Sequence, residues 1–126
     1  MKAFKIPLIV LIALLILSIA DSLFLTAQCD RWNTLLSAAD TAAVQDDWVR
    51  AEQSLRSLDE SWQSRQTYLH IMIEHDEIDS ADTLLHLCFL YCAEKDTAAL
   101  RAVVSQLQCQ FSLLAETEQL SIKNVL

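Results

Sequence analysis

The amino-terminal part of the chain carries one long apolar stretch. Residues 6–20 include no charged side chain, and after Asp21 and Ser22 the apolar character resumes as far as Ala27. As an α-helix that rises ~1.5 Å per residue, residues 6–27 would span roughly 33 Å, enough to cross a bilayer core of ~30 Å. The pattern therefore predicts a transmembrane helix in contact with membrane lipid over residues 6–27, with Asp21 near the far interface.

The residues after this stretch are typical of helices that pack together in water. Residues 22–45 mix polar with apolar positions and are rich in alanine, so we expect the anchor helix to continue until about Gln45. Asp46 and Asp47 then interrupt the pattern. Either side chain could cap the next helix by accepting a hydrogen bond from its free N–H groups.

The next segment has the clearest periodicity in the chain. Positions spaced alternately by three and four residues form one stripe: Trp48, Ala51, Leu55, Leu58, Trp62, Arg65, Leu69 and Met72. Such a stripe is the contact face of an antiparallel bundle or coiled coil, and it predicts one helix over residues 48–72. Arg65 is the exception among apolar positions, and it could keep its charge in water or pair with a carboxylate.

Two further helices complete the pattern. One starts near Asp76 and places Ile78, Ala81, Leu85, Cys88 and Cys92 on one stripe; the other presents Leu100, Val103, Val104, Leu107, Phe111 and Leu114. A break at residues 93–96 separates them, and a short tail follows from Glu116 to Leu126. Residues 47–58 and residues 96–107 are weakly similar, since each segment starts with an aspartate and has apolar residues at corresponding positions. The sequence thus predicts an all-α fold, in which the transmembrane helix continues into a small antiparallel bundle of two αα-hairpins.

Composition narrows the fold and excludes two classes of function. The chain has no glycine and one proline, so β-hairpins are disfavoured and neither a P-loop nor a dinucleotide-binding fingerprint can be present. Acidic residues outnumber basic ones by 17 to 9, for a formal net charge of −8. An acidic chain repels the phosphate backbone, so we expect no nucleic-acid partner.

Charges that flank the apolar stretch predict its orientation. Lys2 and Lys5 precede it and Asp21 follows it, which by the positive-inside rule leaves the amino terminus inside and exports the rest. We therefore expect a single-pass protein with an anchor at residues 1–27 and an extracytoplasmic bundle at residues 28–126. The alternative is a signal peptide cleaved after Ala20, because small residues precede that position.

Polar side chains are densest at the corner that follows the long periodic segment. They are His70, Glu74, His75, Asp76, Glu77, Asp79, Asp82 and His86. One hypothesis is a capping corner, with Asp76 as the N-cap and His75 bonded to the backbone across the turn. The exposed residues of that corner would be available to dock a partner: Glu74, His75, Asp76, Glu77 and Asp79. The alternative is a site for a divalent ion such as Zn²⁺ or Mn²⁺, with His75, Asp79, Asp82 and His86 as ligands.

The four cysteines show no clear disulfide pattern. Cys88 and Cys92 lie one turn apart on the same predicted helix, where a disulfide would require distortion. We expect buried free thiols at these two positions and at Cys109. Cys29, just outside the membrane, is the candidate for an intermolecular disulfide.

Three tryptophans are candidates for the core. Trp48 and Trp62 lie on the periodic stripe, so we expect both to be buried. Trp32 follows the anchor, where it could hold the helix at the level of the lipid headgroups or pack on the bundle.

The order of several segments resembles one known family. These segments are the basic amino end, the apolar anchor, Asp47-Trp48-x-x-Ala51-Glu52, Trp62, Ile73-Glu74-His75-Asp76-Glu77-Ile78-Asp79, Glu94-Lys95-Asp96 and Leu120-Ser121-Ile122-Lys123-Asn124-Val125-Leu126. The chain resembles, most specifically at residues 73–79, the uncharacterised domain-of-unknown-function family number four-three-six-three of small membrane-anchored helical proteins from Firmicutes. The resemblance implies an all-α fold, a bacterial cytoplasmic-membrane location and no established activity. It also implies a multi-pass membrane protein, such as one of the YetF type, as partner.

These observations favour a non-catalytic accessory or interaction protein with no cofactor. We expect it to expose an acidic helical domain outside the cytoplasmic membrane and to bind a multi-pass membrane protein or itself. The alternative is an extracytoplasmic domain that binds or senses divalent cations. An enzyme is not expected, because acidic residues and three histidines without a recognisable pocket do not indicate acid–base catalysis.

Overall fold

A computed structural model describes residues 2–73 and 75–125, nearly all of them in α-helices. The helices are α1 (Lys2–Val44), α2 (Trp48–Ser64), α3 (Gln66–Met72), α4 (His75–Glu94) and α5 (Thr97–Val125). No strand occurs among the described residues. The predicted all-α fold is therefore confirmed.

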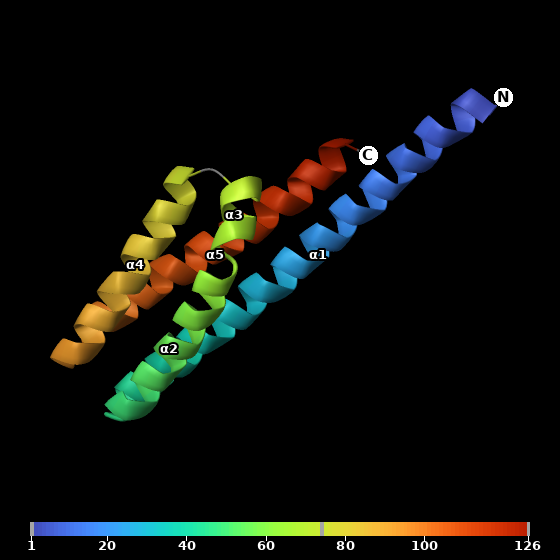
Figure 1. Cartoon of the computed structure of the whole chain (residues 1–126). Coiled ribbons are helices and arrows are strands. Elements are labelled where there is room, and N and C mark those ends of the chain that lie inside the picture. Colours follow the sequence, from blue (N-terminus) through green and yellow to red (C-terminus); the bar gives the residue numbers. More distant parts are fainter. Residues whose placement is uncertain (1, 74, 126) are drawn as a thin grey trace.

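The helices α1, α2, α4 and α5 form an up-and-down bundle along the carboxyl-terminal half of α1 (Figure 1). Successive helices run in opposite directions, and the short helix α3 extends α2 toward the corner that leads into α4. The most extensive packing joins α1 to α5, followed by α1 to α2 and α4 to α5. The two predicted hairpins, α1–α2 and α4–α5, are thus confirmed, and α1 joins them into one bundle.

The amino-terminal part of α1 extends beyond the other helices (Figure 1). Its large apolar side chains from Phe4 to Leu17 are exposed, apart from the half-buried Leu15, whereas Ser22 and Leu25 are the first residues of α1 to be buried in the bundle. The helix is long and apolar enough to cross a membrane. Burial begins six residues before the predicted boundary at residue 28, so the free apolar segment is shorter than expected and ends near Ala20.

The connection between α1 and α2 combines a helix C-cap with an N-cap. Asp46 has a positive φ of 58°, and its N–H donates to the carbonyl of Ala43, while the N–H of Asp47 donates to the carbonyl of Ala42. This hydrogen-bond pattern is a Schellman motif, in which glycine usually occupies the positive-φ position. The Asp47 carboxylate then caps α2 by accepting the N–H of Arg50 at 3.2 Å, as the sequence predicted.

The connection between α4 and α5 has the same geometry. Lys95 has a φ of 55°; its N–H donates to the carbonyl of Cys92, and the N–H of Asp96 donates to the carbonyl of Tyr91. The Asp96 carboxylate accepts the N–H of Ala99 at 3.2 Å and caps α5. The weak similarity between residues 47–58 and residues 96–107 therefore reflects the same type of helix-to-helix turn before each segment.

The single helix predicted over residues 48–72 is wrong, because the chain breaks at Arg65 into α2 and α3. Arg65 has φ −102° and ψ 3°, and its guanidinium lies over the ring of Phe24 in α1, 4.5 Å from the centroid. We attribute the break to this cation–π contact. Beyond it α3 stays beside α1, where the Tyr68 hydroxyl donates to the carbonyl of Asp21 at 3.5 Å.

The last helix is longer than predicted. The segment from Glu116 onward was expected to be a tail, but α5 continues to Val125. The helices α1 and α5 run antiparallel, and polar contacts join them. Gln108 donates to Ser37 at 2.8 Å, and Arg101 pairs with Asp40 at 3.1 Å. These contacts hold the part of α5 that carries the apolar stripe, and the helix continues past Leu114, the last position of that stripe.

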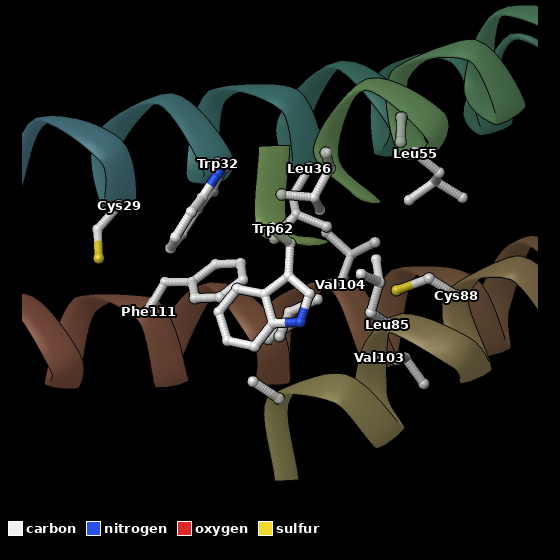
Figure 2. Packing of buried hydrophobic residues seen from close by; sticks show 14 of the residues in the cluster. Cys29, Trp32, Leu36, Leu55, Trp62, Leu85, Cys88, Val103, Val104 and Phe111 are labelled. Atoms are coloured by element: carbon white, nitrogen blue, oxygen red, sulfur yellow. The ribbon is translucent and has the colours of Figure 1, made fainter. Parts of the chain in front are cut away.

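An aromatic cluster forms the centre of the core (Figure 2). The rings of Trp32, Trp62 and Phe111 contact one another pairwise, with centroids 5.1–5.6 Å apart, and come from α1, α2 and α5. Both buried indole N–H groups have acceptors: Trp32 donates to Ser61 at 2.8 Å, and Trp62 donates to the Asp82 carboxylate at 3.1 Å. The bond to Asp82 connects α4 to the same cluster.

The core position of Trp62 is confirmed. For Trp32, the second of the two predicted positions, packing on the bundle, is confirmed. Trp32 packs inside the bundle rather than at the membrane interface. The prediction for Trp48 is wrong, since this side chain is only half-buried. It lines a shallow groove of about 310 Å³ between the first turns of α2 and the last turns of α4. The other lining residues are Val49, Glu52, Phe89, Cys92, Ala93 and Lys95.

We expect glycine at position 95 to stabilise the protein. A left-handed conformation costs a non-glycine residue about 1–2 kcal/mol, so Lys95→Gly should raise the free energy of unfolding by about 1 kcal/mol. The measurement is thermal unfolding of the protein in detergent micelles, followed by circular dichroism. As a control, Ala102→Gly in an exposed helical position should lower stability by about 0.5–1 kcal/mol. Destabilisation by Lys95→Gly would contradict the Schellman geometry.

Candidate functional site

The polar corner predicted from the sequence lies between α3 and α4. The short helix α3 ends at Met72, and Ile73 is extended, with φ −129° and ψ 151°. Glu74, one of the predicted interaction residues, lies outside the described residues. The other four predicted interaction residues are all exposed to solvent: His75, Asp76, Glu77 and Asp79.

The start of α4 differs from the prediction by one residue. The helix begins at His75, so Asp76 lies in its first turn and is not the N-cap. Asp76 and Glu77 place negative charge at the positive end of the helix dipole, which stabilises the first turn. The corner is therefore an exposed, acidic helix start.

Two histidine rings meet across this corner. The Nδ1 atoms of His70 in α3 and His75 in α4 are 3.2 Å apart, and the ring centroids are 4.8 Å apart. The predicted bond from His75 to the backbone is thus replaced by a contact with a second imidazole. Two residues five positions apart on one continuous helix would lie about 140° apart around its axis. The extended backbone at Ile73 brings these rings together. Without it, no spacing in the sequence indicates that His70 is the partner of His75.

The four predicted metal ligands do not converge on one point. His75 contacts His70, while the half-buried Asp82 accepts the indole N–H of Trp62 and so belongs to the core. His86 is exposed, and its Nδ1 lies 2.7 Å from the backbone carbonyl of Asp82. In residues 2–73 and 75–125, no three or more His, Cys, Asp and Glu side chains are grouped to hold a metal ion. The set His75, Asp79, Asp82 and His86 is therefore not assembled.

All four cysteines are free thiols. Cys88 and Cys92 are buried as predicted, but Cys109 is exposed, because it lies on the outer face of α5. Cys29 is buried one turn before Trp32, beside the aromatic cluster (Figure 2), so it is not accessible for an intermolecular disulfide. Both of these sequence predictions are wrong, since neither helix face could be assigned without the packing.

Burial makes two of the thiols inert. Desolvation, with a smaller contribution from the neighbouring Asp30, raises the pKa of Cys29 to about 12. Desolvation, with a smaller contribution from Cys92, also raises the pKa of Cys88 to about 12. The reactive form of cysteine is the thiolate, so both groups stay protonated and unreactive at neutral pH. Cys109 is the exposed thiol among the four.

Comparison with known proteins identifies the family. No curated protein and no solved structure matches the chain. The family model described as Domain of unknown function (DUF4363) matches residues 21–125. This range starts where α1 enters the bundle and ends with the last residue of α5. The chain therefore belongs to the DUF4363 family.

Proposed function

We propose that this chain is a non-catalytic, membrane-anchored interaction protein that exposes its acidic bundle on the outer side of the bacterial cytoplasmic membrane. The observation that carries the proposal is the division of α1 into two parts. The first part exposes large apolar side chains around the helix, and the second part forms a wall of the bundle. Each large aliphatic side chain left in water forfeits about 1.5–3 kcal/mol of burial free energy, and a bilayer core removes that cost.

The length of the free segment fits a membrane. Residues 3–20 span about 27 Å as a helix, close to the ~30 Å hydrocarbon core of a bilayer. Asp21 follows directly, and the contact between Arg65 and Phe24 lies one turn further along α1. Charged groups at that level are near the interface, where their cost is small compared with the midplane. Lys2 and Lys5 at the opposite end favour an amino terminus inside the cell.

Continuity of α1 supports retention of the anchor. The helix runs through Ala20 without a break, so the anchor and the first helix of the bundle are one element. A chain cleaved after Ala20 would still contain every buried residue of the bundle. The anchored and cleaved forms therefore differ in mass and in membrane retention rather than in fold.

The exposed corner is the surface that we propose for the partner. His75, Asp76, Glu77 and Asp79 lie together at the start of α4, in a chain whose net charge is −8. Such a surface is complementary to a basic one, and complementary charge increases both the rate and the selectivity of association. We propose that the partner is another membrane protein, because attachment to the same bilayer raises the effective concentration of the two proteins.

Charges in the middle of the free segment should release the protein from the membrane. We expect the double variant Leu11→Arg, Leu14→Arg to lose most of its membrane-bound fraction, since each central arginine costs about 2.5–3.5 kcal/mol on insertion. The measurement is the share of protein that stays in the membrane pellet after alkaline carbonate extraction, with the mass of the mature chain. Val44→Arg, at an exposed apolar position of the same helix, is the matched control and should stay in the pellet. A wild-type chain that starts at Asp21 in the soluble fraction would contradict the anchor.

The exposed thiol reports which side of the membrane holds the bundle. A membrane-impermeant maleimide added to intact cells should label Cys109, because the other three thiols are buried. Cys109→Ser should abolish the labelling. A second variant with Ala3→Cys added to Cys109→Ser should be labelled only after lysis, since position 3 lies at the inner end of the span. Labelling of Cys109 only in lysed cells would contradict the proposed orientation.

Removal of the corner charges should weaken partner recovery. We expect the variant Asp76→Asn, Glu77→Gln, Asp79→Asn to recover about tenfold less of the membrane protein that crosslinks to the wild-type chain in its own membranes. The measurement is affinity isolation after mild crosslinking, with quantitative mass spectrometry. The control variant Glu60→Gln, Glu94→Gln, Glu116→Gln removes the same charge from other exposed positions and should recover the wild-type amount. An equal loss in both variants would contradict a specific role for the corner.

A further inference from the structure

We propose that the His70–His75 pair binds a divalent transition-metal ion such as Zn²⁺ through its two Nδ1 atoms. The inference does not depend on the membrane or on the proposed partner. It rests on two imidazoles from different helices, whose nitrogens face each other at 3.2 Å on the surface of the protein.

The spacing of the two nitrogens matches a metal chelate. Zinc binds histidine nitrogen at 2.0–2.1 Å in tetrahedral geometry, so two nitrogens on one ion are about 3.3 Å apart. His70 and His75 already hold their Nδ1 atoms at 3.2 Å. The separation of the two nitrogens therefore already matches that of a chelate.

The protons of the pair are accounted for in both states. Without metal, one neutral ring donates its Nδ1–H to the Nδ1 lone pair of the other, because two facing lone pairs or two facing N–H groups would repel. With metal, both rings offer an Nδ1 lone pair and carry their single proton on Nε2. The shared proton moves from Nδ1 to Nε2 of the same ring, so a neutral pair binds the ion without net proton release.

The surroundings of the pair favour a cation. Asp76 and Glu77 follow His75 in the first turn of α4, and the whole chain has a net charge of −8. Neutral imidazole is a preferred ligand of Zn²⁺, Cu²⁺ and Ni²⁺. No third His, Cys, Asp or Glu side chain among the described residues completes the set, so the pair leaves coordination positions to ligands other than those side chains, water among them. We therefore expect exchangeable rather than permanent binding.

His86 provides a matched control within the same helix. It is exposed like the other two histidines, but its Nδ1 lies 2.7 Å from the backbone carbonyl of Asp82, a hydrogen-bond acceptor. That nitrogen therefore carries the proton and donates it, so His86 offers a metal ion a single lone pair, on Nε2, rather than a facing pair of nitrogens. His86 belongs to the ligand set predicted from the sequence and not to the His70–His75 pair, so its replacement separates the two possibilities.

The experiment is a titration of the untagged full-length protein in detergent micelles with ZnCl₂, followed by isothermal calorimetry. We expect His70→Ala and His75→Ala each to weaken Zn²⁺ binding at least tenfold, and His86→Ala to leave it unchanged. Because binding to the native state raises the unfolding temperature, Zn²⁺ should stabilise the wild type and His86→Ala but neither of the other two variants. His70→Gln and His75→Gln, which retain a polar side chain, should behave like the alanine variants, and unfolding without metal verifies that each variant is folded.

Two patterns of binding among the variants would overturn the proposal, and so would one result on the wild type. One is Zn²⁺ binding of equal strength in all the variants, which would indicate scattered surface carboxylates as ligands. The other is a loss of binding in His86→Ala with none in His70→Ala, which would indicate the ligand set along α4. Absence of binding to the wild type in the millimolar range would equally refute it.

Discussion

The fold depends on burial of one face of α1 from Ser22 onward. This face supplies Trp32 and contacts both α2 and α5, while α4 joins the same core through the bond between Trp62 and Asp82. Without it, α2 would keep only its smaller contacts with α3 and α4, and α5 would keep mainly its packing against α4, so much of both inner faces would be open to water. The element that anchors the protein is thus also the central wall of its bundle.

Helix boundaries that depend on local chemistry were predictable from the sequence. The end of α1 near Gln45, the cap at Asp47 and the break before Thr97 all follow from polar residues at the termini of apolar stripes. The break at Arg65 was not predictable, because the three-and-four spacing of the stripe continues across it. Arg65 there contacts Phe24, which is distant in sequence and becomes a neighbour only when α1 and α2 pack.

The same reason explains which parts of the candidate site were missed. His70 and His75 would lie on different sides of an unbroken helix, so no spacing rule indicated that they meet. Cys29 and Cys109 were placed on the wrong faces because polar residues flank both positions in the sequence, so only the direction of packing distinguishes the buried face from the exposed one. The four predicted ligands do not come together among the described residues, and one of them, Asp82, accepts a hydrogen bond from the buried Trp62.

The continuity of α1 also has a mechanical consequence. The chain has no glycine and its single proline is Pro7, so α1 contains no residue between the free segment and Val44 that would act as a hinge. Val44 stands roughly 35 Å beyond Asp21 along the helix, so a change in tilt of about 10° within the bilayer displaces the far end of the bundle by about 6 Å. Because α1 is one helix without a hinge, the anchor and the bundle turn together when the anchor changes its tilt, and the displacement is largest at the surface farthest from the membrane.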